Sequence, residues 1–181
     1  IIKKFNKIDG LVNSAYPRSD DWAEDFQQIK LSSWKNNVDM QLGSCFYLTQ
    51  KISGHMIKNK NGSIVNIGSI YGELGPDFSI YKNTKITMPA AYSAIKGAII
   101  NFTRYLASYL GEYNIRCNTF SPGGIFNNQE KIFVKQYESK VPLKRMGTPD
   151  DISPLISFLI SDDSKYITGQ NIKIDGGWSI K

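Results

Sequence analysis

The segment "AAYSAIKGAII", residues 90–100, places a tyrosine and a lysine four residues apart among small and apolar side chains. In a helix, positions i and i+4 lie on one face, so Tyr92 and Lys96 point into the same space. A positive charge about 4 Å from a phenol is worth up to ~4 kcal/mol at an effective dielectric constant of about 20. That energy lowers a phenol pKa from about 10 by up to ~3 units, before desolvation acts against it. The pair therefore predicts a tyrosine that exchanges a proton near neutral pH.

The Tyr-x-x-x-Lys spacing occurs three times, at Tyr47 and Lys51, at Tyr81 and Lys85, and at Tyr92 and Lys96. Ten tyrosines in a lysine-rich chain give such a spacing by chance, so its context has to decide. The first pair lies within a long helical pattern and is typical of a surface pair, and the second has no helical stripe around it. The third combines a helix with small neighbours and follows Ser69, which ends an apolar strand pattern. We therefore select it, with a surface pair as the alternative.

Apolar runs and helical periodicity alternate along the chain and predict the elements that position these residues. Strands are expected at 9–15, 62–69, 114–121 and 170–177, and helices at about 32–58, 89–113 and 149–161. Ser32 or Ser33 is expected to cap the first helix, and Pro154 to fit the last only near its first turn. Residues 70–89 read as a loop, and 127–147 as a polar, partly helical segment. This alternation predicts one α/β domain over 1–181, with a parallel sheet covered on both faces.

Length and composition are those of an ordinary globular domain, with 181 residues, 41 % hydrophobic and 21 % charged. No apolar run is long enough to span a membrane. Cys45 and Cys117 fit no metal spacing and are too few for a disulfide framework, so a cytoplasmic location is expected. The net charge of +6 comes from scattered lysines without a basic run, which disfavours nucleic acid as a partner and suits an anionic small substrate.

Six segments, taken in order, resemble the short-chain dehydrogenase/reductase family over almost the whole chain. They are "LVNSA", "IVNIGS", "YSAIKGAI", "NIRCNTFSPGGI", "RMGTPDDI" and "YITGQNIKIDGG". The resemblance implies a Rossmann-type, doubly wound parallel sheet in three layers. It also implies an oxidoreductase that uses NAD or NADP to interconvert a secondary alcohol and a carbonyl compound. The choice between NAD and NADP is not readable from this sequence.

The resemblance assigns catalytic roles residue by residue. Ser69 would hold the substrate oxygen, Tyr92 would pass the proton, and Lys96 would lower the pKa of Tyr92 while it binds the nicotinamide ribose. Gln41 stands where the family usually has an asparagine that anchors a water of the proton relay, and it would take that role with a longer amide side chain. The rival interpretation is a catalytically silent relative that binds a nucleotide or a partner protein.

Further residues would contact the cofactor. The resemblance implies Asn13, Ser14, Ala15, Tyr92, Lys96, Pro122, Gly123, Ile125 and Asn127. Three positions depart from the family pattern: Ser14 and Tyr16 replace an asparagine and a glycine, and Asn127 replaces a threonine. No metal site is expected.

The stretch between Ser69 and Tyr92 is longer than usual in the family, and the extra length falls in "PDFSIYKNTKITM". Such an insertion would pass over the mouth of the pocket, where loops carry specificity. Tyr71, Glu73, Tyr81 and Gly124 are the candidate substrate contacts, suited to a sugar-like or nucleotide-linked substrate. A solvated loop is the alternative. This stretch also resembles dehydrogenases of bacterial surface-sugar and flagellin-modification pathways.

Two further expectations concern the whole protein. The glycine loop that binds phosphates in this family is not present, so the chain is expected to be the C-terminal part of a longer dehydrogenase. The alternative is a complete protein that works without a dinucleotide. The family also implies a homodimer or homotetramer, packed through the helices at 33–58 and 89–113.

Overall fold

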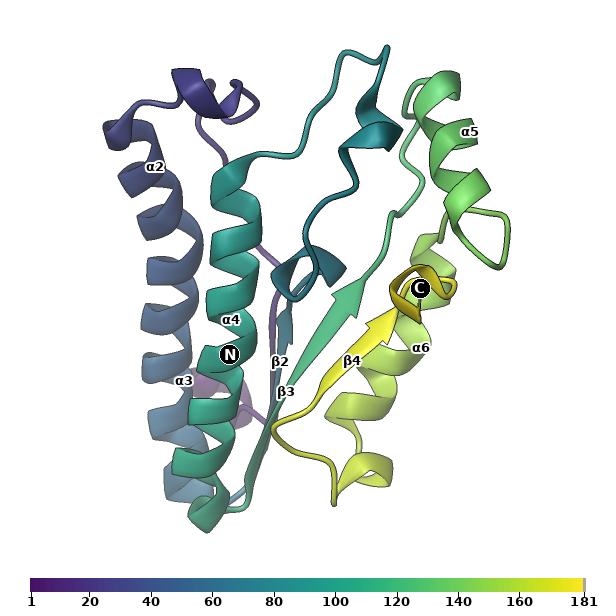
Figure 1. Ribbon diagram of the computed structural model, residues 1–181. Helices are drawn as coiled ribbons and strands as arrows, with labels where there is room; N and C mark the ends of the chain where they lie inside the picture. Colours follow the sequence, from purple (N-terminus) through teal and green to yellow (C-terminus); the bar gives the residue numbers. More distant parts are fainter. Residues whose placement is uncertain (181) are drawn as a thin grey trace.

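A four-stranded parallel sheet forms the centre of the computed structural model, which describes residues 1–180 (Figure 1). The strands lie in chain order: β1 (Gly10–Asn13), β2 (Gly62–Ile67), β3 (Ile115–Pro122) and β4 (Asn171–Ile174). Each neighbouring pair is parallel, with Val12 opposite Val65 and Phe120 opposite Ile172. The α/β class and the parallel sheet expected from the sequence are therefore confirmed.

Helices cover both faces of this sheet (Figure 1). On one face lie α2 (Leu31–Val38), α3 (Ser44–Asn59) and α4 (Ala90–Leu110), and on the other lies α6 (Pro149–Ile160). Side chains of β2 alternate between the two layers: Ile64 packs with Met56 and Leu106, and Val65 packs with Leu159. This period of two is the pattern that a strand buried on both faces requires.

The other helical segments, apart from the π-helical turn described below, are ten residues long or shorter. They are α1 (Ile2–Phe5), α5 (Lys131–Lys140), η1 (Phe26–Gln28), η3 (Ile70–Gly72), η4 (Phe78–Tyr81), η5 (Gly111–Tyr113), η6 (Asp162–Ser164) and η7 (Trp178–Ile180). Over residues 1–180, no helix is both long and apolar enough to cross a bilayer. The same residues contain no cluster of side chains suited to hold a metal ion.

The first long helix differs from the expectation. It begins at Leu31 after Lys30, and a π-helical turn, η2 (Asp39–Gly43), separates α2 from α3. Ser33 does not cap this helix, because it lies inside α2, where its hydroxyl donates to the Asp21 carboxylate at 2.7 Å. A π-helical turn widens the helix locally and is frequent at functional sites.

The last helix also differs. Pro154 lies inside α6, beyond the first turn, and the helix continues to Ile160. The start of the helix is well capped, because the carboxylate of Asp151 accepts a hydrogen bond from the Thr148 backbone amide at 2.8 Å. Packing of Leu159 in the core outweighs the backbone hydrogen bond that Pro154 cannot donate.

The stretch expected as a loop is ordered against α5. Ile80 in η4 is only 1 % exposed and packs with Phe133 and Tyr137 of α5. The side-chain amide of Gln136 donates to the Ile80 carbonyl at 3.1 Å. The inserted segment is thus part of a small second core, which fixes its position beside the end of β2.

Candidate active site

Ser69 lies just beyond the carboxyl end of β2, where the chain turns into η3. Its hydroxyl is buried and accepts the backbone N–H of Tyr71 at 3.2 Å. Three residues after Ser69, Gly72 touches the backbone of α4: a Cβ there would lie 2.8 Å from the carbonyl oxygen of Lys96. Only glycine allows this approach, and it places Ser69 beside the first turns of α4.

Tyr92 lies in the first turn of α4, and its hydroxyl faces Ser69. Burial raises the pKa of Tyr92, and the hydrogen bond from Ser69 offsets part of that rise. The spacing of Tyr92 and Lys96 predicted a lowered pKa for Tyr92, and that prediction is wrong, because the pKa of Tyr92 is raised. The physical reason is that desolvation of the phenol outweighs the charge of a lysine whose ammonium is engaged elsewhere.

Lys96 is 7 % exposed, and its ammonium donates a hydrogen bond to the carbonyl oxygen of Ile67 at 2.8 Å. The same nitrogen lies 5.7 Å from the ring centroid of Tyr92. Burial lowers the pKa of Lys96 to about 8, and the charge of the Cys45 thiolate on α3 acts in the opposite direction. An ammonium has three donors, so at least two remain for a ligand.

A cavity of about 300 Å³ lies between the end of β1 and α3, next to Lys96. It brings together five residues expected at the cofactor or relay site, namely Asn13, Ser14, Ala15, Gln41 and Lys96. The amide of Asn13 also holds the sheet to its helix layer, since it donates to Asn66 at 2.7 Å and to Thr49 at 2.9 Å. This cavity is consistent with the cofactor contacts expected on the β1 side.

The comparisons with known proteins agree with this geometry. The family model described as enoyl-(acyl carrier protein) reductase matches residues 1–179. The chain belongs to the short-chain dehydrogenase/reductase family.

Similar proteins of known sequence include the post-translational flagellin modification protein A of Campylobacter coli, 36 % identical over 98 % of this chain and 70 % of that protein. Another is a 3-oxoacyl-(acyl-carrier-protein) reductase of Thermotoga maritima, 38 % identical over 98 % of this chain and 68 % of that protein. A solved short-chain dehydrogenase of Leptospira borgpetersenii with bound NAD⁺ is 39 % identical, with a TM-score of 0.89 over 98 % of this chain and 68 % of that chain.

Gln41 of this short-chain dehydrogenase/reductase lies in the π-helical turn η2 and is 5 % exposed. Its side-chain amide donates to the carbonyl oxygen of Pro17 at 2.9 Å. The glutamine side chain, longer than the usual asparagine, thus forms a hydrogen bond that stabilises the loop after β1. That contact was not expected from the sequence.

The expected contacts beyond β3 lie apart from the cavity at Lys96. Gly124 and Ile125 line a second, smaller cavity of about 80 Å³ with Tyr137 and Gly147. Gly123 packs against Asp175, and a Cβ there would lie 2.8 Å from the Asp175 Cα. Pro122 ends β3, and Asn127 is exposed, with its backbone amide bound to Gln129. The structure therefore places these residues at the same sheet edge without bringing their side chains to Lys96.

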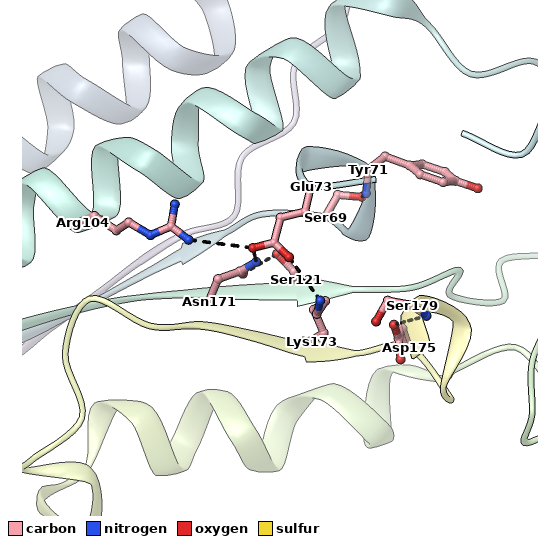
Figure 2. Close-up of polar contacts among 9 residues, drawn as sticks. All are labelled: Ser69, Tyr71, Glu73, Arg104, Ser121, Asn171, Lys173, Asp175 and Ser179. Atoms are coloured by element: carbon pink, nitrogen blue, oxygen red, sulfur yellow. Dashed lines mark hydrogen bonds and ion pairs between the residues drawn. The ribbon is translucent and has the colours of Figure 1, made fainter. Parts of the chain in front are cut away.

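The candidate substrate residues separate into two groups (Figure 2). Tyr71 points away from Glu73; its hydroxyl is buried and has no hydrogen-bond partner among residues 1–180. Burial raises the pKa of Tyr71, and raises that of Tyr81 to about 12, so both phenols are protonated donors.

Glu73 points toward the sheet instead (Figure 2). Its carboxylate accepts a hydrogen bond from Asn171 at 2.9 Å and pairs with Lys173 at 3.1 Å and Arg104 at 3.9 Å. These partners belong to β4 and α4. Glu73 therefore connects η3 to two neighbouring elements.

Two aromatic residues at the site were not among the expected site residues. Tyr16 lies with its ring centroid 5.6 Å from that of Tyr92, in an edge-on arrangement, and Trp22 lies 6.4 Å from Tyr92. Trp22 is buried with Ala91 and Ile95 of α4. The available signal was Tyr16 itself, because it replaces a glycine of the family pattern. Nothing in the sequence around Trp22 indicated its contact with Tyr92.

Proposed function

We propose that this short-chain dehydrogenase/reductase interconverts a secondary alcohol and a carbonyl compound, with Tyr92 as the group that exchanges the proton. The observation that carries this function is the convergence of Ser69, Tyr92 and the buried Lys96 at the end of β2. In an open parallel sheet, this edge is where ligands bind. The rival function, binding without catalysis, would not need a serine hydroxyl against a partly buried tyrosine.

The proton step follows from these positions. Ser69 donates its hydroxyl hydrogen to the substrate oxygen and holds it next to Tyr92. In the oxidation direction, the proton of the substrate hydroxyl moves to the ionised Tyr92 oxygen; in the reduction direction, the Tyr92 phenol returns it to the substrate oxygen. Lys96, positively charged below its pKa, favours the ionised form of Tyr92.

The residues around the cavity fit a nicotinamide cofactor. Lys96 keeps free donors for a ribose hydroxyl, and Asn13, Ser14 and Ala15 line the space next to it. The cofactor, when bound, accepts or supplies the hydride. Structural relatives support both forms: the Leptospira enzyme is solved with NAD⁺, and a gluconate 5-dehydrogenase of Burkholderia cenocepacia, 25 % identical, is solved with NADP.

An oxygen-rich substrate is the second part of the proposal. The buried phenol of Tyr71, two residues after Ser69, and the partly buried phenol of Tyr81 on the inserted segment offer hydrogen-bond donors to such a substrate. The Campylobacter relative is named for post-translational flagellin modification, in keeping with the resemblance of the inserted stretch to dehydrogenases of that kind. Exposed aromatic side chains on α3 and α4, among them Phe46, Tyr47 and Tyr105, support a dimer or tetramer packed through these helices.

The test has two stages. First, NADH and NADPH are titrated into the protein, with cofactor fluorescence as the signal. Second, NAD⁺ and NADP⁺ reduction is followed at fixed pH with acetoin, gluconate, a 7α-hydroxysteroid and a 3-hydroxyacyl thioester as probes. We expect saturable binding of one cofactor and turnover with a polar probe. Binding without any turnover would favour the silent relative, and no binding of either cofactor would reject the proposal.

A further inference from the structure

Tyr16 occupies a position from which its ring contacts both members of the catalytic pair. It follows β1 directly, in the loop that leaves the sheet edge. Its ring lies edge-on to Tyr92 with 5.6 Å between centroids, and the Lys96 ammonium lies 5.7 Å from its ring centroid. The same ammonium is equally far from the Tyr92 ring centroid, so the cation and the two rings form a compact cluster of three groups.

The surrounding structure fixes the Tyr16 ring. Trp22 packs edge-on against it at 5.8 Å, and the Arg18 guanidinium lies 5.2 Å from its centroid. The neighbouring carbonyl of Pro17 is held by Gln41. The contacts with Trp22 and Arg18, together with those to Tyr92 and Lys96, define one orientation for a side chain that remains 39 % exposed.

Lys96 has few other groups that stabilise its charge. The titratable groups that face it are Tyr16 from the loop, Tyr92 from α4 and Cys45 from α3. None of the ion pairs formed within residues 1–180 includes Lys96. The carbonyl of Ile67 and the two rings are therefore the polar and aromatic surroundings of this buried cation.

We propose that Tyr16 is a positioning residue of the active site, whose aromatic ring holds the Lys96 ammonium and the Tyr92 ring in their working arrangement. The effect of Tyr16 on catalysis rests on the proposed function, whereas its effect on Lys96 does not. A cation near an aromatic ring is attracted by the ring quadrupole, and the attraction strengthens when water is excluded. The ring, and not the hydroxyl of Tyr16, is the group that acts.

Three variants separate the ring from the hydroxyl. Tyr16→Leu removes the aromatic ring but keeps an apolar side chain that excludes water. Tyr16→Phe removes only the hydroxyl and is the conservative rescue. Tyr166→Leu is the matched control, because it makes the same substitution at a fully exposed tyrosine.

The first readout is the titration of Lys96, followed by NMR in protein with ¹³C-labelled lysine, its signal assigned by its loss in Lys96→Arg. This readout needs neither cofactor nor substrate. In the unchanged protein we expect a midpoint near the pKa of about 8 that burial gives Lys96. In Tyr16→Leu the midpoint falls by about one pH unit, the size of a desolvated cation–π contact. In Tyr16→Phe and Tyr166→Leu the Lys96 midpoint should stay within about 0.3 pH units of that of the unchanged protein, because neither variant removes the cation–π contact.

The second readout is the pH profile of kcat/KM for the best probe found above. Tyr16→Leu shifts the rising limb of the oxidation profile to higher pH and lowers kcat/KM by about tenfold, because Lys96 then favours ionised Tyr92 less. An unchanged or raised Lys96 midpoint in Tyr16→Leu, or an equal fall in Tyr16→Phe, overturns the proposal. If no probe is turned over, the function fails, and the Lys96 titration still decides the role of Tyr16.

Discussion

The ammonium of Lys96 donates to the main-chain carbonyl of Ile67 at 2.8 Å, and this bond joins α4 to the last residue of β2. The strand ladder fixes the direction of that carbonyl, because Ile67 pairs with Phe120 of β3. The position of the Lys96 ammonium is thus set by backbone geometry. Substitution of the Ile67 side chain would leave the acceptor in place.

Replacing Tyr92 by phenylalanine tests the proton-transfer role. We expect kcat to fall by about 10²–10⁴-fold, the usual contribution of a positioned general acid or base. NADH affinity should change much less, because the ring and its packing remain. Steady-state kinetics and fluorescence titration measure the two effects, with Tyr166→Phe as the exposed control. Full activity in Tyr92→Phe would remove Tyr92 from the mechanism.

The buried charge of Lys96 predicts a pH-dependent stability. Its pKa is lowered from 10.5 to about 8 in the folded state, so between these values the unfolded chain holds a proton that the folded chain has lost. The free energy of unfolding therefore gains a contribution that rises with pH across this window. Urea unfolding at about pH 7.5 and 9.5 should show a larger rise for the unchanged protein than for Lys96→Met. Equal rises in both proteins would mean that Lys96 is not desolvated.

Gly72 and Gly75 form a matched pair of positions. In Gly72→Ala the new methyl group would lie 2.8 Å from the Lys96 backbone and 2.6 Å from Ile100, whereas nothing lies within 4 Å of a Cβ at Gly75. We expect Gly72→Ala to lower the free energy of unfolding by about 1–3 kcal/mol. It should also lower kcat by up to about 100-fold, because the added methyl group pushes η3 away from α4 and so moves Ser69 away from Tyr92. Gly75→Ala should do neither, and equal effects at both positions would contradict the close contact.

Gln41 offers a test of the loop that carries Tyr16. Gln41→Leu leaves the Pro17 carbonyl without its donor and should lower the free energy of unfolding by about 1–3 kcal/mol. Gln41→Asn restores the residue usual in the family but is one methylene too short for that bond, so we expect it to behave similarly. Exposed Gln28→Leu serves as the control in the same urea titrations. A Gln41→Asn protein as stable as the original would show that the contact with Pro17 contributes little.

The sequence predicted the elements that carry strong periodicity. The strands around Val12, Val65 and Phe120 and the helix of Tyr92 and Lys96 appear within a few residues of the expected bounds. The order of motifs also indicated that Ser69 and Tyr92 would meet. These features follow from local pattern and from the rule that parallel strands end at one edge.

Other features depend on contacts between distant residues and have no local signal. The sequence around Gln41 has the same helical pattern whether the turn is α-helical or π-helical, so the π-helical turn could not be predicted from it. The direction of the Tyr92 pKa depends on burial, which spacing alone does not reveal. Glu73 looked like a pocket residue, and its partners on β4 lie about 100 residues further along the chain.

The strand register has a consequence for how the chain folds. Each strand pairs with a neighbour about fifty residues away, as in Gly10 with Ser63, Gly62 with Ile115 and Thr119 with Asn171. Forming the sheet therefore requires three long loop closures before the strand contacts repay their entropy. Refolding should be slower than that of a helical bundle of the same length. Until each loop closure is made, a strand that waits for its partner exposes an unpaired edge, and such partly folded states are prone to aggregation.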